Sequence, residues 1–107
     1  MSTFDERQKG FEQKYKHDQE LQFKVNARRN KLLGLWAAEQ MGLAGADAES
    51  YAKEVVQADF ETAGDSDVIA KVVKDLGAKG KAVSELQIRK ELDRLLAVAK
   101  EQIMKQS

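Results

Sequence analysis

The sequence predicts an all-α fold, a four-helix bundle preceded by a flexible N-terminal segment. Apolar residues recur at helical spacing in four segments, and glycines separate these segments. No comparable run alternates apolar and polar residues with the period of two that is typical of a strand. We therefore divide the chain of 107 residues into a mobile N-terminal segment, residues 1–17, and a four-helix globular domain, residues 18–107.

The first two predicted helices lie in the first half of the globular domain. One runs from about Asp18 to Met41 and ends at Gly42. Its centre, residues 32–36, is apolar most of the way round, which is typical of a helix at the middle of a bundle. The next helix begins at Asp47, a favourable N-cap residue, and ends before residue 64, a glycine.

The last two predicted helices follow short connections. The third has Asp65 as its N-cap and Gly77 as its stop. The fourth opens with the capping-box pattern of residues 84–87 and places Ile88, Leu92, Leu95, Ala99 and Ile103 on one face. These apolar stripes, together with the aromatic residues Trp36, Tyr51 and Phe60, are enough for one core.

The N-terminal segment is polar except for three aromatic residues. Phe4, Phe11 and Tyr15 lie along one helical stripe. Gly10 costs about 1 kcal/mol relative to alanine in a helix, and a helix of this length is marginal alone in water. We expect the segment to be loose when free and helical when a partner's apolar groove receives its aromatic rings. The alternative is an arm folded back onto the bundle.

Composition excludes several function classes. The 18 basic and 18 acidic residues give zero net charge, so nothing global favours nucleic acid as a partner. Without cysteine the chain has no disulfide, no thiolate nucleophile and no sulfur-ligated metal. No apolar run has the length of a secretory signal or a membrane span. We expect a soluble, cytoplasmic protein, monomeric when free and without direct membrane insertion.

No catalytic constellation is recognisable, and we expect the protein not to be an enzyme. A Ser-His-Asp or Cys-His mechanism needs a positioned histidine, but the only one, His17, lies in the polar N-terminal segment. The acidic run that starts at Asp59 hints at a calcium loop. Alanines occupy two of the ligand positions that such a loop requires, so we expect no metal site.

A glycine- and lysine-containing turn at residues 77–81 resembles a phosphate-binding loop. Ala82 stands where that motif needs a hydroxyl group, and no predicted strand precedes the turn. The turn is therefore interpreted mainly as a solvated connection. A nucleotide-sensing helical binding module, which would use Lys79 and Lys81 or the basic patch around Arg28, is the alternative function.

Two further features are candidates for binding or regulation. A basic set on one face of the first helix is either a secondary interaction patch or a solvated face that pairs with acids of the second helix; its members are Lys24, Arg28 and Lys31. His17 adjoins Asp18 and Glu20 at the junction of the segment and the first helix. It is a candidate pH switch for ordering the segment, or an exposed histidine without a role.

Several stretches of the chain carry a family likeness. Residues 27–38, ARRNKLLGLWAA, closely resemble the zeta subunit of alphaproteobacterial F-type ATP synthases. Further matching stretches are residues 4–7, 11–15, 17–21, 51–56, 58–61 and 96–104. The resemblance covers essentially the whole chain, and residues 77–83 carry the least of the family pattern.

The resemblance implies an inhibitory and regulatory subunit whose partner is the catalytic head of the ATP synthase, with its α, β and γ subunits. In this family the N-terminal segment becomes helical, inserts at the catalytic α/β interface near γ and blocks ATP hydrolysis. Transferred to this chain, aromatic side chains would fill apolar grooves and basic ones would pair with acids, a set that comprises Phe4, Phe11, Tyr15, Arg7, Lys9 and Lys14. The resemblance also implies weak ATP or ADP binding, for which no residues here mark a site, and no other cofactor.

Overall fold

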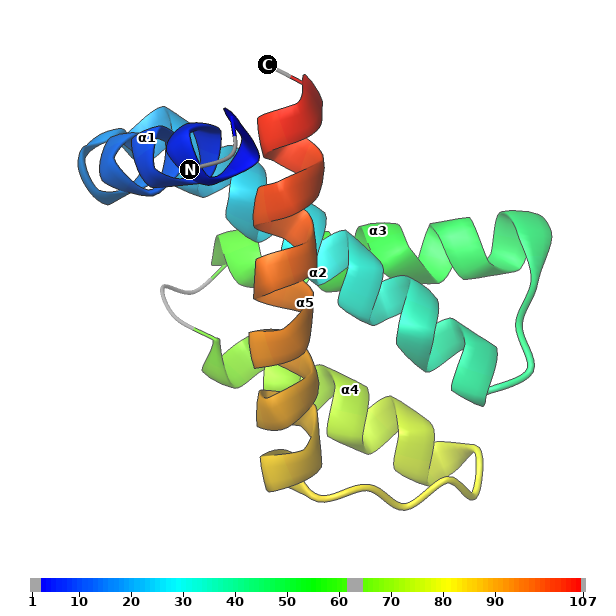
Figure 1. Cartoon of the computed structure of the whole chain (residues 1–107). Helices are drawn as coiled ribbons and strands as arrows, with labels where there is room; N and C mark the ends of the chain where they lie inside the picture. The colour runs from blue at the N-terminus through cyan, green and yellow to red at the C-terminus, as the bar shows by residue number, and fades with distance from the viewer. Residues whose placement is uncertain (1–2, 62–64, 107) are drawn as a thin grey trace.

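The computed structural model describes the backbone of residues 3–61 and 65–106, and the side chains of residues 6–59 and 65–106. Its described part is made of α-helices without strands (Figure 1): α1 Thr3–His17, α2 Gln19–Gln40, α3 Gly45–Glu61, α4 Ser66–Ala78 and α5 Glu85–Gln106. The predicted all-α class is confirmed. The described residues form five helices instead of the predicted four, because α1 is added to the four helices α2–α5.

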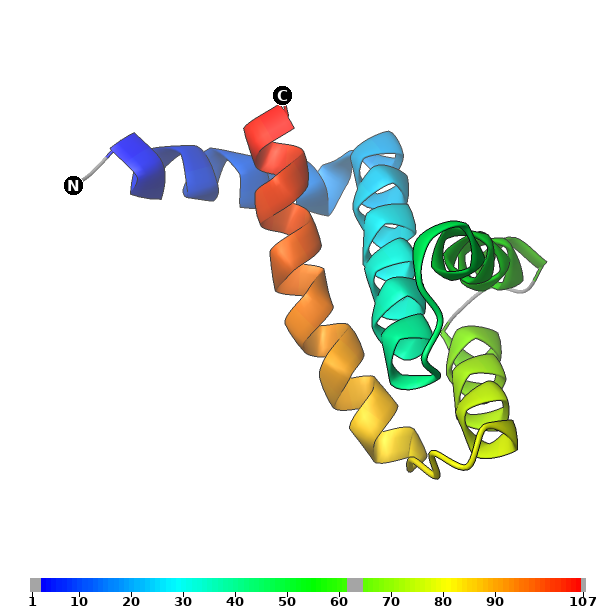
Figure 2. The same ribbon diagram turned by 90° about the vertical axis from the view of Figure 1, so that its right-hand side faces the viewer.

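Helix α2 is the central element of the fold. It contacts each of the other four helices. Helix α5 runs along one side of α2, while α3 and α4 lie on the other side (Figure 2). Helix α1 crosses near the C-terminal end of α5, and its N-terminal part projects beyond α5 (Figure 2). The apolar character of residues 32–36 therefore has the predicted cause, because these residues lie where α2 is surrounded by other helices.

Two apolar clusters form the interior. The main core lies between α2, α3, α4 and α5 and consists of Leu33, Ala37, Ala38, Tyr51, Val55, Val68, Ile69, Val72, Leu76, Ile88, Leu92 and Leu95. The second, which we call the docking cluster, consists of Phe11, Val25, Ala99, Ile103 and Met104. Leu32 packs against both clusters, and the partly buried Trp36 packs against the main core. The side chain of Phe60, predicted to belong to the core, lies outside the described residues.

The ends of two helices agree with the sequence. Ser84 and Gln87 form a reciprocal capping box: the Ser84 amide donates to Gln87 Oε1 at 2.8 Å, and the Gln87 amide donates to Ser84 Oγ at 3.1 Å. Gly42, directly after the C-cap of α2, has a φ of 80°. This left-handed conformation lets the Leu43 amide donate to the Ala38 carbonyl, as in a Schellman motif.

Two predicted helix ends are wrong in detail, and a third is at its predicted residue but lacks the capping hydrogen bond. Helix α3 begins at Gly45, so Asp47 lies in its first turn instead of at its N-cap. Asp65 occupies the N-cap of α4 but makes no capping hydrogen bond. Helix α4 continues through Gly77 to Ala78, and the chain turns at Gly80, whose φ is 78°. The predicted stop of the second helix at residue 64 lies outside the described residues.

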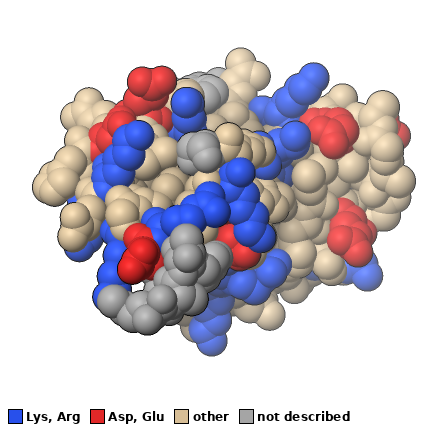
Figure 3. Space-filling view, turned by 45° about the horizontal axis from the view of Figure 1, so that its top comes forward, with Lys and Arg blue, Asp and Glu red and all other residues tan. Residues whose placement is uncertain are grey.

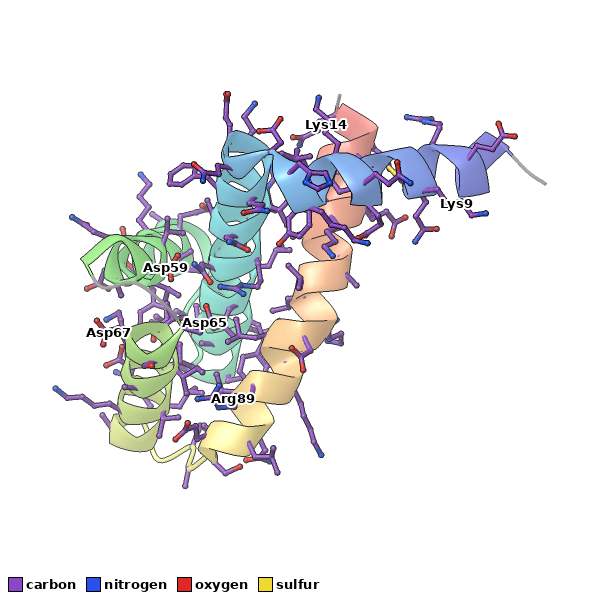
Figure 4. The ribbon with its side chains drawn as sticks, turned by 90° about the vertical axis from the view of Figure 1, so that its left-hand side faces the viewer. Lys9, Lys14, Asp59, Asp65, Asp67 and Arg89 are labelled. Atoms are coloured by element: carbon purple, nitrogen blue, oxygen red, sulfur yellow. The ribbon has the colours of Figure 1, made fainter. Side chains whose placement is uncertain are left out.

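A polar cluster explains why Asp65 does not cap its own helix. Its carboxylate accepts a hydrogen bond from Arg29 Nη2 at 2.7 Å, and the Arg29 side chain is buried. Arg29 also donates to Asn30 Oδ1 at 3.2 Å. Burial raises the pKa of the nearby Asp59 carboxyl, and the charge of Asp65 adds to this effect, while Arg29 and the Asn30 hydrogen bond oppose it. Asp59 and Asp65 lie where α3 and α4 approach each other (Figure 4).

Helices α2 and α3 approach each other closely at Gly34. A Cβ atom built on this buried glycine would lie 2.6 Å from the Cα atom of Ala52. Real Cβ atoms essentially never come this close to a neighbouring atom. The absence of a side chain at Gly34 therefore permits the crossing of the two helices.

Candidate partner-binding segment and its docking site

Helix α1 is the candidate partner-binding element, because it carries every predicted inhibitory residue. Its described side chains from residue 6 to residue 10 are exposed, whereas the ring of Phe11 is only 8% exposed. Phe11 packs in the docking cluster against α2 and α5, and Tyr15 is half-buried at its edge. Phe4 lies in the first turn of α1, but its side chain lies outside the described residues.

Polar contacts from α5 and α2 hold α1 in place. The Lys100 ammonium lies 3.3 Å from Glu12 Oε2 and 4.4 Å from the centroid of the Tyr15 ring. From α2, Gln22 Nε2 donates a hydrogen bond of 2.7 Å to the Tyr15 carbonyl. Both contacts lie in the C-terminal half of α1.

The chain turns steeply between α1 and α2 at Asp18 (Figure 2). This residue caps α2, and its side chain accepts a hydrogen bond from the Leu21 amide at 3.1 Å. The capping hydrogen bond itself uses no side chain of α1. Such a junction allows α1 to change its direction while α2 keeps its first turn.

The basic residues of α1 lie on its exposed surface. Arg7, Lys9 and Lys14 all have exposed side chains. Lys9 and Lys14 point to different sides of the helix (Figure 4). The aromatic residues Phe11 and Tyr15 thus face the body of the protein, and charged residues surround them.

The structure differs from the expectation that residues 1–17 are loose in the free protein. Residues 3–17 form a helix that is docked on α2 and α5, which corresponds to the folded-back alternative. The physical reason is the apolar surface at the ends of α2 and α5, to which Val25 and Ile103 contribute. A helix that buries a phenylalanine on such a surface no longer depends on its own marginal stability in water.

Sequence reasoning missed Glu12 and Lys100 as docking residues. They are 88 positions apart, and no local spacing relates them. Glu12 is one of several acids in a polar segment, and Lys100 is one of several bases on α5. Their contact follows only from the position of α1 across α5.

The basic patch on α2 does not pair with acids of α3 among the described side chains. Lys24 lies 3.8 Å from Glu20 on its own helix, and Arg28 donates to Gln102 Oε1 at 3.0 Å. Lys31 is exposed and has no acidic partner in this part of the structure. The predicted pairing with the second helix of the bundle is therefore not found among the described side chains.

The remaining candidates lie on the surface. His17 is exposed at the C-terminal end of α1. Lys79 and Lys81 are exposed in the turn between α4 and α5, at the opposite end of the molecule from α1 (Figure 1). In the described part of the chain, no group of three or more His, Cys, Asp or Glu side chains is placed to hold a metal ion. No described helix combines the length and apolar character needed to cross a membrane.

Comparison with known proteins places the chain in a family. A family model described as ATPase inhibitor subunit zeta matches residues 1–102. A protein whose structure was determined by NMR in solution is 50% identical, with a TM-score of 0.71, over 81% of this chain and 99% of that one. The comparison with curated proteins gives no match. The family model spans nearly the whole sequence, and the chain therefore belongs to the family of ATPase inhibitor zeta subunits.

Proposed function

We propose that this protein inhibits ATP hydrolysis by inserting α1 at the catalytic α/β interface of an F-type ATP synthase, near γ. Membership of the inhibitor family supports the activity. The observation that carries the insertion step is the separation of the two apolar clusters. No described α1 side chain belongs to the main core, so α1 can leave its docking site without opening that core. The four-helix body, residues 18–107, would then act as the anchor on the cytoplasmic head of the enzyme.

The free energy of docking is small enough for a partner to overcome. Burial of Phe11 contributes about 1.5–3 kcal/mol. The ion pair between Lys100 and Glu12 is partly exposed and contributes less than about 1 kcal/mol. A groove that buries several aromatic rings of α1 more completely would compete with the docking cluster. The apparent affinity for the enzyme would then equal the affinity of undocked α1 multiplied by the fraction of molecules in which α1 is undocked.

The arrangement of α1 supports distinct roles for its two kinds of residue. In the inserted state Phe4, Phe11 and Tyr15 would fill apolar grooves at the subunit interface. The exposed bases Arg7, Lys9 and Lys14 would pair with acidic side chains of the enzyme. Rotation in the hydrolysis direction would tighten the interface around the helix, and rotation in the synthesis direction would expel it. This gives inhibition that acts in one direction.

Releasing α1 should strengthen inhibition. In the variant Lys100→Glu the ion pair to Glu12 becomes a repulsion, and the cation over Tyr15 is lost. We expect the concentration for half-inhibition to fall about 3- to 10-fold, which corresponds to the loss of roughly 1 kcal/mol of docking free energy. The measurement is a titration of ATP hydrolysis by the isolated catalytic head.

A matched control separates release from a change of net charge. Lys105 also forms an ion pair, at 3.0 Å, but its partner Glu101 belongs to α5 itself. Lys105→Glu should leave half-inhibition within about twofold of the unchanged protein, since an exposed pair of this kind contributes little. If Lys100→Glu inhibits no better than Lys105→Glu, docking of α1 does not limit inhibition.

We propose His17 as a pH-sensitive residue of the inhibitory helix. It lies in the last turn of α1, where the negative end of the helix dipole favours a positive side chain. We expect inhibition to differ between pH 6 and pH 8 in the wild type, and no such difference in His17→Ala. Lys16→Ala, which removes a neighbouring exposed charge, should keep the dependence. Equal pH dependence in the wild type and His17→Ala would remove His17 from the proposal.

A further inference from the structure

An open groove of about 750 Å³ lies along α2, between α1 and the C-terminal end of α5 on one side and α3 on the other. The α2 side chains that line it follow helical spacing: Glu20, Leu21, Phe23, Lys24, Ala27, Arg28 and Lys31. Residues 20 to 31 span about 16 Å at 1.5 Å per residue. The groove is therefore as long as about three turns of a helix.

Apolar side chains from four helices line this groove. Phe11 comes from α1, Phe23 and Ala27 from α2, Val56 from α3 and Ile103 from α5. The Phe23 side chain is 55% exposed, which is unusual for a large apolar residue in this protein. A contiguous apolar surface rimmed by charged residues is typical of a protein-binding site.

The charged side chains in the groove give it an excess of unpaired positive charge. Among the described side chains, Lys14 and Lys31 have no acidic partner, and Arg28 is bonded only to the neutral Gln102. The acids there are engaged: Asp18 caps α2, and Glu20 lies 3.8 Å from Lys24. Basic side chains also gather near the middle of the face seen when the top of Figure 1 is turned forward (Figure 3).

We propose that this groove binds an acidic amphipathic helix of a partner protein, about three turns long. An extended peptide would need a free strand edge, whereas the walls here are helices whose backbone groups are already bonded. A helix satisfies its own backbone and presents apolar residues at i, i+3, i+4 and i+7 to such a groove. Carboxylates on its flanks would meet Lys14, Arg28 and Lys31.

The occupant would also regulate α1. Phe11 and Lys14 belong to α1, so the groove is complete only while α1 is docked. A ligand that binds only the docked form stabilises that form, and docking of α1 in turn raises the affinity for the ligand. This inference rests on the proposed function: a partner bound in the groove keeps α1 docked, so α1 does not reach the ATP synthase and inhibition is relieved.

The test uses the full chain and a designed probe. The probe is a blocked 18-residue peptide of Glu, Ala and Leu, with leucines along one helical face. We expect saturable amide shifts at groove residues such as Ala27 and Val56, and slower hydrogen exchange in α1. Joint substitution of Lys14→Glu and Lys31→Glu should weaken binding at least tenfold. The control Lys90→Glu, exposed on α5 outside the groove, should change it less than twofold.

Several outcomes would overturn the proposal. These are equally tight binding by a peptide with scrambled leucines or with Lys for Glu, or no saturable shift at all. Groove shifts with phosphatidylcholine–phosphatidylglycerol vesicles but not with the peptide would assign the surface to an anionic membrane. Shifts that depend only on protein concentration would assign it to a second copy of the chain.

Binding and inhibition are measured separately, so the two proposals can fail separately. Peptide shifts and exchange in α1 are recorded on the free protein without any ATP synthase. A relief of inhibition by the acidic peptide, lost in the Arg28→Glu and Lys31→Glu variant, whose α1 is unchanged, supports regulation by the groove. Peptide binding that leaves the half-inhibitory concentration unchanged in the wild type overturns the regulatory part.

Discussion

A chain that begins at Asp18 is expected to inhibit ATP hydrolysis at least about 100-fold less than the full chain, because it lacks every aromatic anchor of α1. Its fold should persist, since the main core contains no described α1 residue and the Asp18 side chain that caps α2 is retained. Exposure of Val25 and Ile103 should lower the melting temperature only slightly. Circular dichroism and a hydrolysis titration measure the two properties.

Point variants in the full chain distinguish lost anchors from lost length. The double substitution Phe11→Ala and Tyr15→Ala removes the two described rings and should weaken inhibition by more than tenfold. Gln8→Ala, on the exposed surface of the same helix, should change it by less than twofold. Inhibition that survives in the chain beginning at Asp18 would exclude α1 as the inhibitory element.

The substitution Gly34→Ala should destabilise the protein by about 2 kcal/mol, although alanine is the better helix former. The new Cβ atom would meet the backbone of Ala52 at 2.6 Å, so α2 and α3 must move apart. Gly34→Val should cost about 3 kcal/mol or more, since a larger side chain enters the same contact. Urea denaturation measures both effects, and the dependence of the unfolding free energy on urea concentration should stay unchanged.

Gly10→Ala is the matched control for this prediction. Nothing lies within 4 Å of a Cβ atom at Gly10, and the residue is exposed in the middle of α1. Alanine there should gain up to about 1 kcal/mol of local helix stability without loss elsewhere. If Gly34→Ala were as stable as Gly10→Ala, the helices would not be in close contact at Gly34.

The pattern of apolar residues was sufficient to predict the helices of the body, because each helix buries one face on its neighbours. It also placed α2 at the centre, since residues 32–36 are apolar on nearly all sides. Helix ends were less predictable where a distant partner competes with a local cap. Asp65 has the residue type of an N-cap, but Arg29, 36 positions away, binds its carboxylate instead.

The candidate site was predictable in part. The spacing of Phe11 and Tyr15 predicted an apolar stripe on a helix, and both rings lie on the side of α1 that faces the body. Spacing does not say which surface covers such a stripe, because that depends on where the ends of α2 and α5 meet. The docking of α1 and the contact between Glu12 and Lys100 were therefore beyond local sequence patterns.

The division into two apolar clusters has a consequence for the evolution of this protein. Substitutions in α1 can be selected for fit to an enzyme surface without also being selected for folding of the body, since the main core does not depend on them. Leu32 of α2 links the two clusters, because it packs against both. A substitution there would affect both the main core and the docking of α1, so we expect fewer substitutions to be tolerated at Leu32 than along α1.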